Sequence, residues 1–456
     1  MSDDGFDDGG AFAEDAARVA AELFARIGEQ NPQPRLEPTR RAVELLGDPH
    51  RSAPVVHLTG TNGKTSTARM VESLLRASGL RTGLLTSPHL VRINERIVID
   101  GEPVSDEALV RNWDDIQPYL AMVDTELEGA GELPLTYFEA LTVLAFAVFA
   151  DAPVDVMVLE VGMGGEWDST NVADGQVAVF TPIALDHQKR LGDTVAEIAR
   201  TKAGIIKPSA RVVSAIQSID ALDELSRAAE LDEAVLAVER RDFAVESTTV
   251  AVGGQLIDLR GIAGRYPGVF LPLYGDHQAQ NAAVAVAAVE SFLGGAERPL
   301  DPDVVAEGLG TATSPGRLQL IGVEPTVLVD AAHNPHGARS LAAALAEYFE
   351  FDEVGLVLAV LEDKDAQGIV EELAPVATRI LVTRSSSDRA IPVDDLAAIA
   401  RHVAGPDAVQ AHDDLTAALD AARGWALAGE KRAVVVAGSI TLVGDAIALA
   451  AAEGWK

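Results

Sequence analysis

The segment GTNGKTST at residues 60–67 has the residue types and spacing of a loop that holds phosphate groups. It follows the apolar run PVVHLTG at residues 54–60 and precedes a stretch in which apolar residues recur at helical spacing. A strand, a glycine-rich turn and the start of a helix form the context in which backbone N–H groups can face one anion. Gly60 and Gly63 permit the turn, and Lys64 adds a positive charge.

This loop is shorter than the usual P-loop, which reads G-x-x-x-x-G-K-[ST]. Counting back from Lys64, the first glycine would stand where this chain has Leu58. The hydroxyl of Thr65 or Ser66 follows the lysine and can reach a phosphate or Mg²⁺. Taken alone, the segment fits either a phosphate site or a strand-to-helix turn that merely requires glycines.

Two later apolar runs end in residues that could ligate a metal ion. Glu160 in VMVLEVGMGG stands near the carboxyl end of an expected strand, where open α/β sheets place their ligands. Asp186 and His187 end the next expected strand, in PIALDHQKRLG. Mg²⁺ takes few protein ligands besides phosphate oxygens and water, which fits so sparse a set. A buried salt bridge at Glu160 and a packing or capping role for His187 are the alternatives.

The composition limits the classes of partner. Acidic residues outnumber Lys and Arg by 70 to 36, giving a net charge of −34, so nucleic acid and anionic membranes are not expected to bind. An anionic small molecule would need local positive groups or a metal ion. The chain has no cysteine, its N-terminus is acidic and Gly-rich, and no apolar run approaches membrane-spanning length. We therefore expect a cytoplasmic protein.

Strand and helix patterns alternate along most of the chain. A length of 456 residues predicts two or three domains. The first series of patterns predicts a mostly parallel, doubly wound α/β sheet. Its expected helices cover 13–27, 37–46, 65–78 and 136–149, and its expected strands cover 54–60, 81–87, 154–162 and 176–183.

A second series begins near residue 326 and predicts a smaller, Rossmann-like α/β domain of five or six strands. Its strands are expected at 326–332, 354–360, 379–385 and 433–439, and GLGTATSPGRLQLIG at 308–322 is expected to link the two series. The predicted division is a disordered tail at 1–10, an N-terminal P-loop ATPase domain at 11–311 and a C-terminal domain at 312–456.

Several blocks together resemble the folylpolyglutamate synthase/dihydrofolate synthase family of the Mur ligase superfamily. They run in order from about residue 35 to 450. They are GTNGKT, TSPHLVRINERIVIDG, LEVGMGGEWDSTN, LDHQKRLG, KAGIIKP, GDHQAQNAAVA, SPGRLQL, DAAHNPHGARSL and AGSITLVGD. GTNGKT is shared with the cell-wall Mur ligases, whereas SPHLVRINERI is specific to the folate branch. In this superfamily the shortened loop is the normal form.

The resemblance implies a ligase that joins L-glutamate to a carboxylate of dihydropteroate or a reduced folate, using ATP and Mg²⁺, with two ions expected. The carboxylate would first become an acyl phosphate, which the glutamate amine then attacks. Lys202 matches a lysine that is often carbamylated, and burial can supply the neutral amine that this requires. Bacterial members are often bifunctional and monomeric, and domain closure is expected to accompany substrate binding.

The site residues implied by the resemblance fall into four groups. The catalytic group is Lys64, Glu160, His187 and Lys202. The ATP-binding group is Gly60, Thr61, Asn62, Gly63, Lys64, Thr65, Ser66, Asn281, Arg317 and Asp330. The metal ligands are Ser87, Glu160, His187 and Lys202. The folate- and glutamate-binding group is Ser87, Pro88, His89, Arg92, Phe138, His333 and Ser439, with core packing as the alternative for Phe138.

One position departs from the family pattern: Glu166 stands where an arginine is common. Two other functions are weighed against the folate ligase. A Mur ligase acting on a UDP-muramoyl precursor would carry a further N-terminal domain, whereas about 50 residues precede this loop. A non-catalytic nucleotide switch would be expected to carry an [NT]-K-x-D guanine-reading motif, which the sequence lacks.

Overall fold

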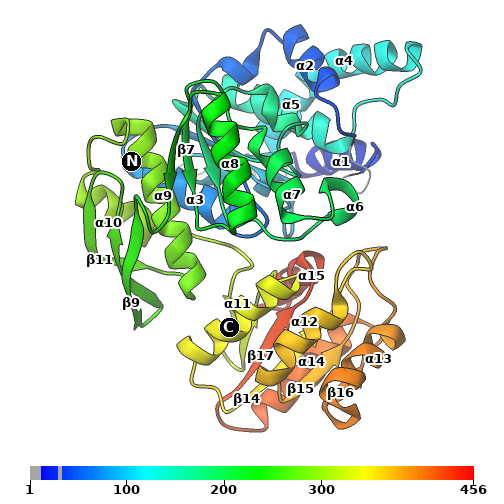
Figure 1. Cartoon of the computed structure of the whole chain (residues 1–456). Coiled ribbons are helices and arrows are strands. Elements are labelled where there is room, and N and C mark those ends of the chain that lie inside the picture. The colour runs from blue at the N-terminus through cyan, green and yellow to red at the C-terminus, as the bar shows by residue number, and fades with distance from the viewer. Residues whose placement is uncertain (1–11, 29–32, 456) are drawn as a thin grey trace, which may run out of the picture.

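The computed structural model describes residues 12–28 and 33–455, so the tail predicted at 1–10 lies outside the described residues. Two α/β units lie one above the other, with the first two-thirds of the chain forming the upper unit in Figure 1. The predicted fold class, a large mostly parallel sheet followed by a smaller α/β domain, is confirmed.

The upper unit is built on an eight-stranded sheet in the order β4-β3-β2-β5-β1-β6-β7-β8. Every neighbouring pair is parallel except β2–β3 and β3–β4, which are antiparallel. The strands are β1 (Val55–Thr59), β2 (Thr82–Leu85), β3 (Ile97–Ile99), β4 (Glu102–Pro103), β5 (Val156–Glu160), β6 (Gly175–Phe180), β7 (Arg211–Ser214) and β8 (Val235–Val238).

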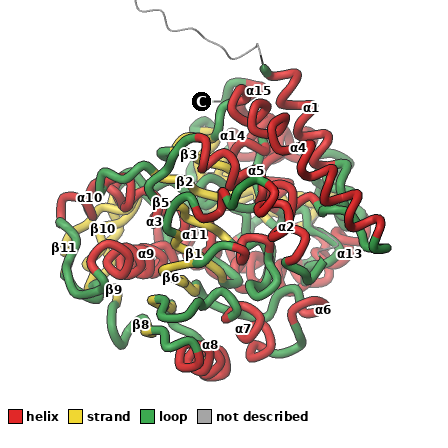
Figure 2. The backbone as a smooth tube through the Cα atoms, turned by 90° about the horizontal axis from the view of Figure 1, so that it is seen from above, coloured by secondary structure: helices red, strands yellow, loops and turns green. Residues whose placement is uncertain are grey.

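Helices cover both faces of this sheet because alternate strand residues are apolar on both sides. Val56 and Leu58 of β1 point into the core beneath α3 (Lys64–Ala77) and α9 (Asp276–Gly294). Val55 points the other way, into a core shared with α5 (Tyr137–Asp151). The remaining helices are α1 (Ala13–Phe24), α2 (Glu37–Leu45), α4 (Asp106–Gly129), α6 (Gln188–Leu191), α7 (Val195–Ala203), α8 (Ile219–Leu231) and α10 (Pro302–Gly310). Figure 2 shows α1, α4 and α2 along one outer side of the molecule.

The lower unit has a six-stranded sheet in the order β12-β13-β17-β14-β15-β16, parallel except for β12. One face packs on α11 to α13 and the other on α14 and α15. The strands are β12 (Gln319–Gly322), β13 (Thr326–Val329), β14 (Glu353–Leu358), β15 (Arg379–Val382), β16 (Val409–Ala411) and β17 (Arg432–Ala437). The helices are α11 (Pro335–Tyr348), α12 (Ala366–Leu373), α13 (Val393–Ala404), α14 (Leu415–Leu427) and α15 (Ile440–Glu453).

Two features differ from the sequence-based expectation. The predicted linker at 308–322 is partly regular, because α10 extends to Gly310 and β12 begins at Gln319. A three-stranded antiparallel sheet was not predicted; it consists of β9 (Ala244–Ala251), β10 (Gly254–Arg260) and β11 (Arg265–Leu271). Its mixed polar and apolar strands pack one face on α9 and α10. The predicted domain boundary at 311 stays a prediction. Within the described ranges, no helix is both long and apolar enough to span a bilayer.

Candidate active site

The phosphate-loop candidate joins the carboxyl end of β1 to the first turn of α3. The Thr61 N–H donates to the Pro182 carbonyl oxygen at 2.9 Å, and the Thr61 hydroxyl donates to the Ala184 carbonyl oxygen at 3.1 Å. These bonds fasten the loop to the segment after β6. The Lys64 ammonium bends back over the loop and donates to the carbonyl oxygens of Gly60 and Thr61, at 3.2 and 3.3 Å.

Both loop glycines are required by close packing. A Cβ on Gly60 would lie 1.9 Å from the Thr181 hydroxyl oxygen, and one on Gly63 would lie 2.7 Å from the Asn281 amide oxygen. Gly63 also has a φ of +86°, which side chains other than glycine rarely adopt. The close approach at Gly63 brings Asn281, on α9, against the loop.

Glu160 ends β5 directly beside this loop and is 1% exposed. Its carboxylate accepts the Thr65 hydroxyl at 2.8 Å and the Ser87 N–H at 3.3 Å. Burial raises the pKa of Glu160, and the nearby charges of Lys64 and Arg69 oppose that rise. A carboxylate with two donors and no direct ion pair among the described residues is well placed to accept a cation.

An ion pair between the two units involves the segment that follows β6. Lys364, from the loop before α12, donates to the Asp186 carboxylate at 3.1 Å, and both side chains are largely buried. Burial opposes ionisation of Asp186, but His187 and Lys364 outweigh it and lower the pKa of Asp186. Burial lowers the pKa of His187 to about 4, so its imidazole is neutral at pH 7 and can act as a ligand.

Lys202 on α7 also contacts the phosphate-loop candidate. It is 4% exposed, and its ammonium donates to the Gly60 carbonyl oxygen at 2.8 Å, the oxygen that Lys64 also contacts. Burial, followed by the charge of Lys64, lowers the pKa of Lys202 to about 7. A substantial fraction of this side chain is therefore a neutral amine near pH 7.

The lower unit contributes residues from the linker and the ends of β13 and β17. Asp330 accepts the N–H groups of Leu318 and Ala332, both at 2.9 Å, and burial raises its pKa although Arg317 opposes this. His333 is bonded through Nδ1 to the Ala331 carbonyl oxygen at 2.9 Å, and burial lowers its pKa to about 4.

Ser439, directly before α15, is fully buried, and its hydroxyl has no hydrogen-bond partner within the part of the chain that the structure describes.

Sequence reasoning missed the polar bonds that join the loop to the lower unit. Asn334 donates to the Asn62 amide oxygen at 3.1 Å, and the Asn62 amide contacts His336 Nδ1 at 3.1 Å. The Ser66 and Ser314 hydroxyls are 2.8 Å apart. The sequence offered one signal, since both Asn334 and His336 belong to the HNPH segment that follows β13. The distance of more than 270 residues between the partners concealed the contact.

The residues expected to bind folate lie along the segment after β2 and the start of α5. His89 is bonded to the Arg96 guanidinium at 2.8 Å, and Arg92 forms an exposed ion pair with Asp106 at 2.6 Å. The Arg92 guanidinium is therefore paired with the first residue of α4. Phe138 is half-buried in the core beneath α5, with its ring against Gly162.

Two aromatic residues that the sequence analysis did not select lie close by. The rings of Phe24 and Tyr137 are stacked at 5.3 Å, and the ring of Phe24 is 6.0 Å from that of His89. Glu166, where the family pattern often has arginine, is exposed, and its backbone and Cβ pack against Gly204.

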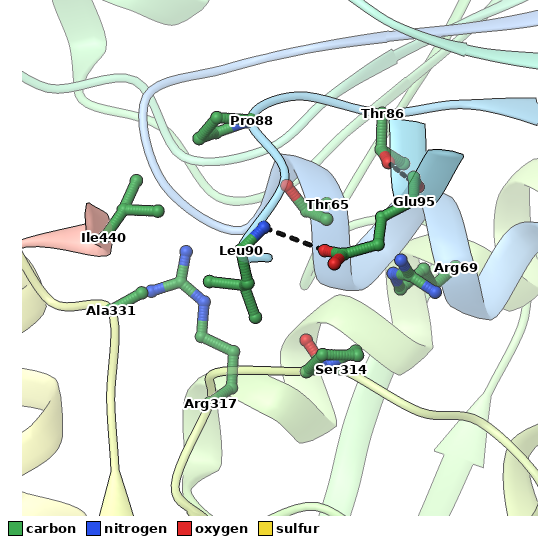
Figure 3. A pocket seen from close by; sticks show the side chains of 11 residues that line it. Thr65, Arg69, Thr86, Pro88, Leu90, Glu95, Ser314, Arg317, Ala331 and Ile440 are labelled. Atoms are coloured by element: carbon green, nitrogen blue, oxygen red, sulfur yellow. Dashed lines mark hydrogen bonds between the residues drawn. The ribbon is translucent and has the colours of Figure 1, made fainter. Parts of the chain in front are cut away.

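A small pocket of about 40 Å³ opens where the two units and the linker meet (Figure 3). Helix α3, the segment after β2, the linker and the start of α15 all line it. The lining residues are Thr65, Arg69, Thr86, Pro88, Leu90, Glu95, Ser314, Pro315, Arg317, Ala331 and Ile440. The structure thus brings Thr65 and Arg317 of the predicted ATP-binding group together with Pro88 of the predicted folate- and glutamate-binding group.

The donor set suits a hard cation that keeps part of its own water. Within the described residues no group of three or more His, Asp or Glu side chains converges as a ready-made metal cage. The Glu160 carboxylate accepts hydrogen bonds from Thr65 and Ser87 among the described residues, and its oxygens can also accept a cation. Mg²⁺, which is commonly held by one or two carboxylates together with substrate phosphates, fits this arrangement.

Comparison with known proteins places both units in one family. The Mur ligase middle domain matches residues 58–289, and the Mur ligase glutamate ligase domain matches residues 316–440. A dihydrofolate synthase/folylpolyglutamate synthase from Mycobacterium tuberculosis is 44% identical over 92% of this chain and 91% of its own length.

Solved structures agree with this assignment. Mycobacterium tuberculosis folylpolyglutamate synthase complexed with ADP is 42% identical, with a TM-score of 0.92 over 96% of this chain and 99% of that chain. Escherichia coli FolC in complex with DHPP and ADP is 28% identical, with a TM-score of 0.82 over 96% of this chain and 98% of that chain. The chain belongs to the dihydrofolate synthase/folylpolyglutamate synthase family of the Mur ligases.

Proposed function

We propose that this protein is an ATP-dependent ligase that adds L-glutamate to dihydropteroate and to the γ-carboxylate of reduced folates. The observation that carries the proposal is the 44% identity to a dihydrofolate synthase/folylpolyglutamate synthase across nearly the whole of both chains. Because the match includes both units, it covers the phosphate loop and the second domain that a two-substrate ligation requires.

The phosphate loop supports the ATP half of the reaction. Backbone N–H groups at the start of α3 and the Lys64 ammonium would hold the β- and γ-phosphates. Thr61, Asn62, Gly63, Thr65 and Ser66 would complete the loop, with Asn281 beside it. Arg317 and Asp330 would bind the nucleotide from the linker and the lower unit. Lys64 and Lys364 provide local positive charge on a protein of net charge −34.

Glu160, Ser87 and His187 would hold Mg²⁺, which when bound neutralises charge on the phosphate oxygens. The neutral imidazole of His187 and the under-bonded carboxylate of Glu160 are both suited to that role. Lys202, with a pKa near 7, has the neutral amine that carbamylation by CO₂ needs, and the carbamate would support a second ion.

The chemistry requires a carboxylate and an amine to meet beside the γ-phosphate. The acceptor carboxylate attacks the γ-phosphorus, ADP leaves, and an acyl phosphate forms. The glutamate nitrogen then attacks the acyl carbon, phosphate leaves, and the nitrogen loses a proton. Pro88, His89, Arg92 and Phe138 would line the folate side, and His333 and Ser439 the glutamate side. A cytoplasmic monomer completes the proposal.

The test is ATP hydrolysis with Mg²⁺ and L-glutamate, with dihydropteroate, tetrahydrofolate, UDP-muramoyl-alanine or no acceptor, followed by mass spectrometry of the products. Gain of one glutamate on dihydropteroate and on tetrahydrofolate is the expected result. Gain on only one of them would make the enzyme monofunctional. Glutamate on the muramoyl compound, or hydrolysis indifferent to every acceptor, would overturn the proposal.

A further inference from the structure

Arg69 stands one helical turn after Thr65 on α3 and faces the small pocket where the two units meet. Figure 3 shows its guanidinium on one side of the pocket and that of Arg317 on the other, with Leu90 and Glu95 between them. Two guanidinium groups therefore border a space the size of a carboxylate or phosphate group. Arg69 is not among the site residues that the family resemblance implies.

One N–H group of the half-buried Arg69 side chain lacks a hydrogen-bond partner among the described residues. Its Nε–H is buried and has no hydrogen-bond acceptor within residues 12–28 and 33–455. Leaving a buried donor without an acceptor is unfavourable, and more so when the group is charged. Three carboxylates lie close enough to affect its charge, those of Glu160, Glu95 and Glu72.

Each of these three carboxylates is already bonded elsewhere. Glu95 accepts the N–H groups of residues 90, 91 and 92, at 2.7 to 2.9 Å. Glu72 accepts the Thr82 hydroxyl at 2.6 Å and the Arg76 guanidinium at 3.0 Å. Glu160 is held by the Thr65 and Ser87 segments. These three carboxylates thus favour the charged form of Arg69 without accepting hydrogen bonds from it. The N–H groups of its guanidinium are left to bind another carboxylate.

We propose that Arg69 binds a carboxylate of a substrate in this pocket and helps to select an acidic amino acid. A guanidinium binds a carboxylate through two parallel N–H···O bonds. An amino acid with a neutral side chain could not form this charged pair with Arg69. The pocket adjoins Thr65 and Glu160, where phosphoryl transfer is proposed, so a carboxylate here lies next to the reacting groups. The inference rests on the proposed ligase function.

Two substrates could bring this carboxylate: the incoming glutamate or the glutamyl tail of the folate acceptor. Dihydropteroate has no glutamyl tail, so reactions with this acceptor isolate the contribution of the incoming glutamate. The test is to measure KM for glutamate, tetrahydrofolate, dihydropteroate and ATP separately in the wild-type enzyme, R69K and R69M. R76M is the matched control, because Arg76 lies on the same helix but pairs with Glu72 outside the pocket.

Loss of a charged hydrogen-bond pair predicts that R69M raises KM about 10- to 100-fold for the substrate concerned. A rise for glutamate with both acceptors assigns the incoming amino acid, and a rise for tetrahydrofolate alone assigns its tail. R69K keeps the charge without the fork and should fall between wild type and R69M, while R76M should retain wild-type KM values.

Unchanged KM values in R69M, or a rise confined to ATP, would overturn the inference. If R69M is unfolded by thermal melting, R69K decides, since a folded R69K with wild-type KM values would also overturn it. A wild-type enzyme that transfers no glutamate would instead refute the proposed function, independently of Arg69.

Discussion

Two glutamates in the upper unit are similarly buried but differ in the number of hydrogen bonds that they accept. Glu290 on α9 is fully buried and accepts four bonds, from the N–H groups of residues 262, 263 and 264 and from the Tyr266 hydroxyl, at 2.5 to 3.1 Å. Glu160 is equally buried but accepts two, and one of these is long at 3.3 Å. Glu290 has the bonding of a structural carboxylate, whereas Glu160 retains capacity for a cation.

The surroundings reinforce this difference. Glu290 fastens the turn between β10 and β11 to α9, and its partners are neutral groups. Glu160 has Lys64 and Arg69 near it and a loop of glycines beside it. Burial of an incompletely bonded acid costs stability, and the nearby cations offset this only in part. A purely structural site would have no reason to retain such a cost.

The largest effect is expected from Glu160→Gln. The variant keeps the side chain's shape but removes the charge that would hold Mg²⁺, so kcat should fall about 100- to 1000-fold. The free energy of unfolding should stay equal or rise, because a poorly paired buried charge has gone. Steady-state ligation assays and urea unfolding measure both quantities. A large loss of stability with kcat preserved would assign Glu160 the structural role instead.

Glu290→Gln should show the reverse pattern. The amide nitrogen would face N–H donors, and loss of the charged bonds should lower the free energy of unfolding by about 3 kcal/mol. Ligation per folded molecule should change less than twofold, because Glu290 lies outside the cleft. Urea unfolding, with activity normalised to the folded fraction, tests this. A loss of kcat comparable to that of Glu160→Gln would erase the contrast between the two sites.

Lys202 is a buried basic group, and its effect on the stability of the protein is expected to depend on pH. Its pKa falls from the ordinary lysine value of 10.5 to about 7 on folding, so the unfolded chain binds the proton more tightly. The resulting destabilisation grows as the pH falls from about 10 to 7 and is complete below 7. Lys202→Met should therefore raise Tm relative to wild type more at pH 6 than at pH 10.

The measurement is the difference in Tm between the two proteins across that pH range. Equal differences at both ends would mean that folding leaves the pKa of Lys202 near its ordinary value. A carbamylated Lys202 would titrate differently, so the series should be repeated with CO₂ excluded.

The smallest effect is expected from Tyr266→Phe, which removes one of the four bonds to Glu290 and also the acceptor of the Leu300 N–H. With three backbone donors left, the free energy of unfolding should fall by about 1 kcal/mol. Activity should be unaffected. If the free energy of unfolding fell as much as in Glu290→Gln, the Tyr266 hydroxyl rather than the backbone N–H groups would be the main partner of the Glu290 carboxylate.

Patterns within a short window were readable in the sequence. The apolar runs around 54–60 and 154–162 became β1 and β5, and GTNGKTST became the turn into α3. The residues at 244–271 did not predict a sheet, because register shifts in β10 interrupt the alternation of polar and apolar residues that a strand with one buried face would show. The linker was predicted too long, since the ends of α10 and β12 lack strong boundary signals.

Residue types and spacing determined that this chain has a glycine-rich loop between a strand and a helix, an acid at the end of a neighbouring strand, and two α/β units. These features are local, because they depend on strand and helix periods and on glycine. The tertiary structure alone decided which side chains meet: Lys202 and Lys64 on one carbonyl oxygen, Asn62 with Asn334, and Arg69 opposite Arg317. Such contacts depend on how elements that are far apart in the sequence pack together, and no short sequence pattern indicates them.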